Sequence, residues 1–146
     1  MIETIINDIN YRLDEDNLTA EVIKKKGYEG DIIIPEIVVF KKVAYRVTSI
    51  GEGAFFHCES LTDITIPNSV KSIEDGAFCQ CSSLTSITIS NSVTSIGYAA
   101  FWDCSSLTSI TFQGTIAQWK KITLRDSWKH NIPATVIHCT EGDVEI

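Results

Sequence analysis

Basic residues are scarce in this sequence of 146 residues, which has 12 Lys and Arg against 19 Asp and Glu and a net charge of −7. Nucleic-acid binding needs clustered Lys and Arg to neutralise phosphates, so this balance argues against a nucleic-acid partner. A membrane-spanning helix needs about 20 apolar residues, and candidate runs such as residues 32–34 stop within a few positions, so we expect no membrane insertion. The start, MIETIINDINYRL, lacks a basic segment followed by an apolar stretch, so no signal peptide is visible.

The motifs of catalytic and cofactor sites are missing as well. There is no Cys-x-x-Cys pair, no Gly-x-Ser-x-Gly turn and no glycine-rich phosphate loop between a strand and a helix. Two of the three scattered histidines directly precede a cysteine, in His57-Cys58 and His138-Cys139. Adjacent residues on an extended segment point to opposite sides, so neither pair contributes two ligands to the tetrahedron that zinc requires. We expect neither an enzyme nor a cofactor or metal site.

What the sequence does contain is an internal repeat of 23 residues. Starting from Ile50, three copies align without a gap, and eight apolar positions recur in each copy. These positions are Ile50/Ile73/Ile96, Ala54/Ala77/Ala100, Phe55/Phe78/Phe101, Cys58/Cys81/Cys104, Leu61/Leu84/Leu107, Ile64/Ile87/Ile110, Ile66/Ile89/Phe112 and Val70/Val93/Ile116. Self-similarity at one fixed period is the signature of a solenoid, in which stacked copies share a core that no copy buries alone.

The spacing within a copy predicts two extended segments and a turn. In Leu-Thr-Ser-Ile-Thr-Ile the last two apolar residues alternate around a threonine, as in a β-strand, and Val-Thr-Ser-Ile indicates a second extended edge. The Gly-Ala-Phe stretch between them is expected to form a short helical turn that directs Ala and Phe inward. Because 23 residues are too few for a strand and a long helix, we predict a β-rich α/β solenoid with parallel β-ladders, folded as one domain over residues 1–146.

The segment before the repeats is predicted to cover the first coil, whose strand edge and core would otherwise be exposed. Apolar and polar residues alternate at residues 9–13 and 20–23, on either side of a polar turn, which indicates a β-hairpin laid across that coil. The predicted division of the chain is an N-terminal cap at residues 1–46, repeats at residues 47–116 and a C-terminal cap at residues 117–146.

The C-terminal cap is expected to contain one helix and one strand. Thr115 is placed to cap a short helix that carries Ile116, Trp119 and Ile122 on one face. A strand over residues 134–139 follows. The large aromatic side chains of this segment are suited to covering the last coil with few residues.

The repeat resembles the BspA-like subclass of the leucine-rich repeat family. The family pattern C-x-x-L-x-x-I-x-I-P-x-x-V-x-x-I-G-x-x-A-F is matched almost completely from Cys58 to Phe78, with Glu74 in place of the glycine, and the next copy has Ser90 in place of the proline. The resemblance implies a short right-handed leucine-rich repeat solenoid in a bacterial surface or secreted protein that acts in adhesion or recognition. It implies an extracellular or cell-surface location, with a cytoplasmic one as the alternative because no signal peptide is visible.

Five cysteines are present, and three of them occupy one position of the repeat. We expect Cys58, Cys81 and Cys104 to stack in a buried column of free thiols, because side chains on neighbouring parallel rungs point the same way rather than at each other. Cys79 is expected to be half-exposed, since its counterparts in the other copies are large aromatic residues.

Outward-facing strand residues are the candidate binding surface, because solenoids align such positions into a continuous face that repeat proteins use for partners. The candidate site residues are Asp63, Thr65, Ser86, Thr88, Ser109 and Thr111. The alternative is that threonine is there only because it favours a solvated strand, and no Trp, Tyr or Arg is present to act as a hot spot. A second candidate is an outer edge that carries Phe56, Tyr98 and Trp102.

These observations favour a non-catalytic protein-interaction or adhesion module that binds a protein or glycan, and we expect a monomer. Between Ile50 and Phe112 six acidic residues are opposed only by Lys71, so a charged partner would be a basic one. The alternative is a structural spacer or an intracellular scaffold without a dedicated ligand site.

Overall fold

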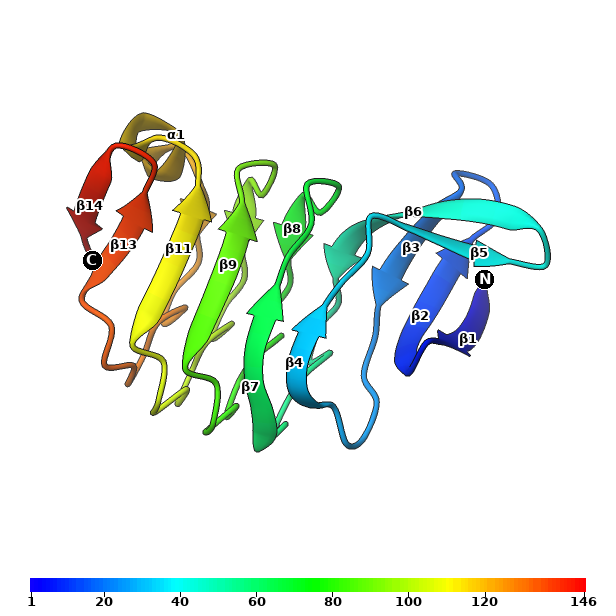
Figure 1. The fold of residues 1–146 in the computed structure, drawn as a ribbon, viewed down its shortest axis with the longest axis horizontal. Helices are drawn as coiled ribbons and strands as arrows, with labels where there is room; N and C mark the ends of the chain where they lie inside the picture. Colours follow the sequence, from blue (N-terminus) through cyan, green and yellow to red (C-terminus); the bar gives the residue numbers. More distant parts are fainter.

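The computed structural model describes residues 1–146 as a stack of short strands in two sheets with one helix (Figure 1). Sheet A contains β1 (Ile2–Ile6), β2 (Ile9–Asp14), β3 (Thr19–Val22), β5 (Ile37–Phe40), β6 (Val43–Ile50), β8 (Ser72–Ile73), β10 (Ser95–Ile96) and β12 (Thr123–Leu124). Sheet B contains β4 (Glu29–Ile33), β7 (Ser60–Thr65), β9 (Ser86–Ser90), β11 (Ser109–Gln113), β13 (Val136–Cys139) and β14 (Gly142–Glu145). The helix α1 (Ile116–Lys120) has five residues, and no helix is long and apolar enough to cross a membrane.

Parallel ladders form the body of both sheets. In sheet B the strands β4, β7, β9, β11 and β13 are successive parallel neighbours. In sheet A the same holds for β3, β6, β8, β10 and β12. The chain therefore alternates between the sheets for about four turns, and the predicted β-rich solenoid is confirmed. The register follows the repeat, since Ile64, Ile87 and Ile110 lie opposite one another on the three central strands of sheet B.

Aromatic rings form a stack through the core. Phe55, Phe78 and Phe101 have ring centroids 5.0 and 5.3 Å apart in nearly parallel planes. Tyr28 and Trp128 extend the stack at its ends, with centroid distances of 4.5 and 6.3 Å to the nearest phenylalanine. All five side chains are buried. The core thus continues beyond the three equal copies and is closed at each end by a different aromatic residue.

The Gly-Ala-Phe stretch directs Ala and Phe inward as predicted, but it forms tight turns without a regular helical segment. In the first copy Ala54 N–H donates to Gly51 O at 3.1 Å, and Phe55 N–H donates to Ala77 O of the next coil at 2.7 Å. Hydrogen bonds between coils replace intrahelical ones because stacking places each turn beside its equivalent in the neighbouring copy.

The N-terminal hairpin is present, but it does not lie across the first coil. β2 and β3 pair antiparallel as predicted, and β1, which the sequence analysis did not predict, pairs antiparallel with β2. β3 then pairs in parallel with β6, so the three strands extend sheet A at its edge. This pairing occupies the backbone groups on one side of β6, which the predicted arrangement would have left open.

A second antiparallel hairpin, formed by β5 and the first half of β6, projects from the N-terminal end (Figure 1). Its buried side chains are Val38 and Tyr45, and its outer face exposes Ile37 and Val39. Because β4 and β13 both belong to the parallel ladder of sheet B, the ladders run beyond residues 47–116 at either end.

The C-terminal cap contains the predicted helix and strand. Gln118 N–H donates to Thr115 Oγ1, and Thr115 N–H donates to the Gln118 side chain, which completes a capping box at the start of α1. Trp119 and Ile122 are buried against the core. β13 begins at Val136, two residues later than predicted, and the antiparallel strand β14 ends sheet B.

Candidate binding face

The predicted binding residues form two straight rows on the outer surface of sheet B, here called the strand face. The rows are Asp63, Ser86 and Ser109, and beside them Thr65, Thr88 and Thr111. All six residues are half-buried, because side chains alternate along each strand and the intervening isoleucines point into the core. The structure therefore brings all six predicted residues together on the three central strands.

Most hydroxyls of the strand face have no partner within the protein. Ser86 Oγ donates to Asp63 Oδ1 at 2.9 Å, so this pair is already occupied. The side chains without an internal hydrogen bond are Thr65, Thr88, Ser109 and Thr111. Beside the face the hydroxyls are used differently, since Thr85 Oγ1 donates to Thr62 O at 3.1 Å. The strand face thus presents four free hydroxyls in a regular array.

Strand pairing adds one residue to each end of the threonine row. Ile33 of β4 lies opposite Thr65 and is 76% exposed. His138 of β13 lies opposite Thr111, and its Nδ1 is 2.8 Å from Asp143 Oδ1 on β14. Sequence reasoning missed both residues because neither is 23 positions from the row, and only the pairing of β4 and β13 reveals them.

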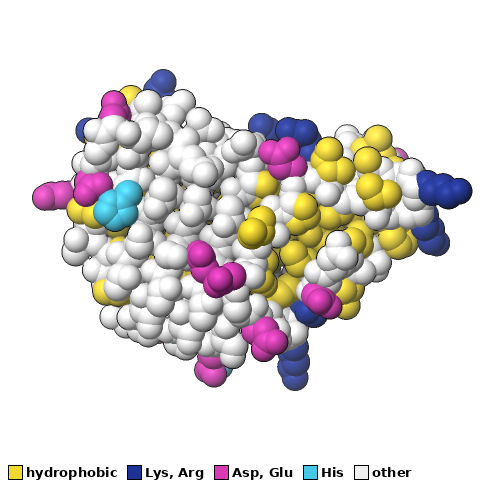
Figure 2. Space-filling model, viewed as in Figure 1, with side chains coloured by type: hydrophobic (Ala, Val, Ile, Leu, Met, Phe, Trp, Pro, Cys, Tyr) yellow, Lys and Arg dark blue, Asp and Glu magenta, His cyan; other side chains and the backbone are white.

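Negative charge gathers at the N-terminal end of the strand face. Asp31 lies opposite Asp63, and its Oδ1 accepts a hydrogen bond from Thr62 Oγ1 at 2.9 Å. The strands β7, β9 and β11 contain no Lys or Arg. Figure 2 shows a largely uncharged polar surface over the central strands, with acidic side chains toward β4 and β7. Such a face favours neutral or basic partners over acidic ones.

The outer edge, the second candidate surface, is not one aromatic patch. The ring of Phe56 has Lys24 Nζ above it, 5.2 Å from the centroid. The ring of Trp102 packs on His130 with centroids 4.1 Å apart. No ring contact joins Tyr98 to either of them. These side chains make separate local contacts and do not form a shared platform for a ligand.

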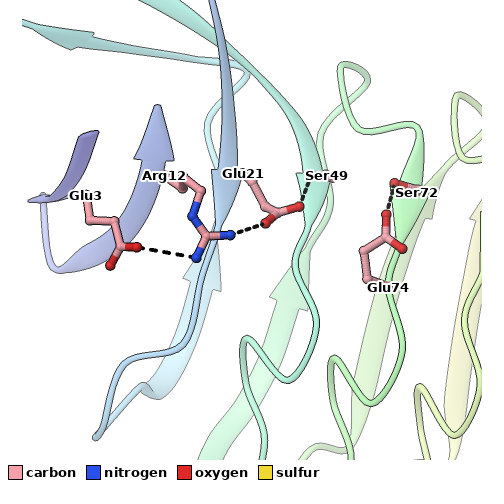
Figure 3. A network of polar contacts seen from close by, with 6 residues as sticks. All are labelled: Glu3, Arg12, Glu21, Ser49, Ser72 and Glu74. Carbon is pink, nitrogen blue, oxygen red and sulfur yellow. Dashed lines mark hydrogen bonds and ion pairs between the residues drawn. The ribbon is translucent and has the colours of Figure 1, made fainter. Parts of the chain in front are cut away.

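A row of charged residues crosses the outer surface of sheet A at its N-terminal end (Figure 3). Arg12 on β2 pairs with Glu3 on β1 at 3.3 Å and with Glu21 on β3 at 3.4 Å. Glu21 Oε2 also accepts a hydrogen bond from Ser49 Oγ at 2.9 Å, which links the added strands to the first coil. The hollow of about 700 Å³ beside this row contains no His or Cys. We interpret the row as fastening the cap, with exposed ion pairs that contribute about 1 kcal/mol or less each.

All five cysteines are free thiols. The predicted column is buried and consists of Cys58, Cys81 and Cys104. Two of its thiols donate to the preceding coil, Cys81 Sγ to Phe55 O at 3.0 Å and Cys104 Sγ to Phe78 O at 2.9 Å. Burial raises the pKa of Cys58 to about 11, so this thiol stays protonated and unreactive at neutral pH. No group of three or more His, Cys, Asp or Glu residues is placed to hold a metal ion.

Comparison with known proteins identifies relatives of the whole solenoid. Residues 22–136 match the BspA type leucine-rich repeat region, in six copies. No curated protein matches the chain. A leucine-rich repeat protein from Bacteroides capillosus has a similar structure, with a TM-score of 0.78, 24% identity, and coverage of 94% of this chain and 97% of that one. At this identity the likeness shows the fold alone.

Two larger bacterial proteins are also similar. A leucine-rich repeat protein from Bacteroides ovatus matches with a TM-score of 0.73 and 27% identity, over 94% of this chain and 37% of its own. A leucine rich cell surface protein from Faecalibacterium prausnitzii matches with a TM-score of 0.67 and 26% identity, over 97% of this chain and 43% of its own. This chain thus spans less than half of either protein. The matched copies extend from the end of β3 to the start of β13, and the chain belongs to the BspA-type leucine-rich repeat family.

Proposed function

We propose that this protein is a non-catalytic interaction module of a bacterial surface or secreted protein, and that its strand face binds a protein or glycan partner. The observation that carries the proposal is the array of free hydroxyls on Thr65, Thr88, Ser109 and Thr111. They project from strands about 4.8 Å apart, so a partner can hydrogen-bond to several of them without disturbing the fold.

The proposed location has separate support from the comparisons. The protein from Faecalibacterium prausnitzii is described as a cell surface protein, and the chain shares its repeat fold at 26% identity. The test is to label intact cells of the native host with a membrane-impermeant amine reagent and to map the labelled lysines. Labelling supports the surface or secreted location, and protection of a chain that is present in the cell contradicts it.

Binding is tested with the whole chain against a glycan array and purified extracellular-matrix proteins. Thr88→Arg places a long charged side chain at the centre of the strand face and should reduce the affinity for a bound partner at least about tenfold. Ser95→Arg is the matched control, because Ser95 is a half-buried hydroxyl residue on β10 of the opposite sheet. Equal effects of the two substitutions on binding would refute the assignment of the strand face.

A structural spacer is the second candidate function. It is favoured by the composition of the strand face, which has no Trp, Tyr or Arg to supply a binding hot spot. If no probe binds the chain, and if no surface substitution changes binding in the native host, a spacer function accounts better for the structure.

A further inference from the structure

Sheet B has an open edge at its N-terminal end. Sheet A continues past the first coil through β3, β2 and β1, whereas sheet B ends at β4, which pairs with β7 on one side and with no strand on the other. Ile34 N–H donates to Thr65 O at 3.2 Å. Backbone groups alternate in direction along a strand, so the N–H and C=O of Ile33 point away from β7 to the open side.

A groove of about 550 Å³ runs along this edge. β4 forms one wall, and the turn between β1 and β2 contributes Asn7 and Asp8 to the lining. The apolar residues of the groove are Ile9, Tyr28, Ile32 and Ile33. Figure 2 shows apolar side chains gathered over this end of the molecule, in contrast to the polar surface of the central strands. The volume is within the range of ligand-binding clefts.

The charges around the groove select its occupant. Asp8, Glu29 and Asp31 line it together with a single cation, Lys25. Lys25 is already engaged, since its Nζ donates to Asp8 O at 2.7 Å and lies 4.8 Å from the centroid of the Tyr28 ring. Pairing β4 with β4 of a second copy would bring the acidic side chains of both edges together, which disfavours that occupant. A segment with basic side chains complements the groove.

We propose that β4 is a docking edge for an extended segment of a partner protein with alternating apolar and basic side chains. The segment adds to sheet B as a further strand, bonds the free N–H and C=O of Ile33, and places a basic side chain beside Asp31. In this mode of recognition main-chain hydrogen bonds supply affinity and alternate side chains supply specificity. The edge borders the strand face, but the segment bonds to the backbone of Ile33 and not to the free hydroxyls of the central strands, so this inference does not depend on the function proposed above.

The probe for this site is the labelled peptide Ser-Val-Lys-Val-Thr-Val-Lys-Ser, titrated with the whole chain and followed by fluorescence anisotropy. Saturable binding is expected. N-methylation of the alternate amides that face β4 should abolish it, because that edge of the added strand then lacks donors, and replacement of both lysines by glutamate should weaken it about tenfold. The proposal is wrong if the unmodified peptide shows no binding up to about 1 mM, or if the N-methylated peptide binds equally well.

Variants of the protein locate the binding. Ile33→Pro replaces the side chain and removes one backbone donor, the outward N–H, at a position where an edge strand accepts proline, and should weaken peptide binding about tenfold. Ile33→Ala keeps that N–H and should weaken binding about threefold, whereas Thr88→Arg should leave it unchanged. Loss of binding in Thr88→Arg, or a concentration-dependent dimer that Ile33→Pro abolishes, would overturn the proposal in favour of the strand face or a second copy. If Ile33→Pro does not fold, the N-methylated peptide decides the question with the unaltered chain.

Discussion

Removal of the Ile87 side chain should destabilise the whole solenoid. Ile87 lies in β9 with 1% of its surface exposed, between Ile64 and Ile110 on the neighbouring strands. Substitution by alanine deletes three carbons, which at about 0.8 kcal/mol per buried group amounts to about 2.4 kcal/mol of lost transfer free energy. The hydrogen-bonded ladders keep the neighbouring strands from closing the gap, so a cavity contribution raises the expected cost to about 3–4 kcal/mol.

Thermal unfolding, followed by circular dichroism, measures this cost. At about 2–4 °C per kcal/mol for a chain of this length, Ile87→Ala should lower Tm by roughly 6–16 °C. Ile87→Val removes a single carbon and should cost about 0.5–1.5 kcal/mol. Thr88→Ala, the next residue on the outer face, is the matched control and should change the free energy of unfolding by about 0.5 kcal/mol or less. If Ile87→Ala lowers Tm no more than Thr88→Ala, the inward register of β9 is refuted.

Three further predictions concern packing, thiols and pH. Gly97→Ala should cost about 1–3 kcal/mol in urea unfolding, because the added Cβ would lie 2.5 Å from Asp75 N on the adjacent coil; an unchanged midpoint would contradict this packing. A thiol reagent at pH 8 should react slowly, and only with Cys79 and Cys139, whose pKa values are raised by partial burial, whereas all five thiols should react in denaturant; rapid native reaction of all five would contradict the buried column. Burial raises the pKa of Tyr28 to about 12, above the value of about 10 for an unfolded chain, so the folded state holds this proton more tightly. The stability linked to this proton is complete below about pH 10 and is lost as the pH rises toward 12, and a free energy of unfolding that stays constant over that range would be the contrary result.

The three central coils could be predicted from the sequence because equivalent residues recur there every 23 positions. At the ends this spacing changes, since Tyr28 and Phe55 are 27 residues apart, as are Phe101 and Trp128. The rings of Tyr28 and Trp128 nevertheless belong to the same stack. The core requires equal positions in space, not equal spacing in the chain. Extra residues can therefore leave the coil as a loop or as the projecting β5–β6 hairpin, and a fixed period does not reveal them.

The N-terminal strands show a second limit of local patterns. Alternation of apolar residues predicts β2 and β3 correctly, because one face of each strand is buried. It does not predict that β3 pairs with the free edge of β6. A strand with one apolar face can pair with any open strand edge beside which that face becomes buried. The choice of partner depends on which edges the rest of the chain leaves unpaired.

The same distinction separates the two proposed binding sites. The six residues of the strand face were predictable because outward orientation is a local property of an alternating strand. The edge of β4 was not predictable, since the continuous apolar run Ile32-Ile33-Ile34 is typical of a buried strand. The pairing order of the whole sheet is needed to show that β4 is its last strand and that Ile33 is exposed there. Repetition thus creates the strand face, whereas the end of repetition creates the open edge. One more coil before β4 would lengthen the strand face and pair with β4, but the strand that it adds to sheet B would then be the open edge. The number of coils therefore sets the length of the strand face, whereas the residues of the last strand set which partner the open edge accepts.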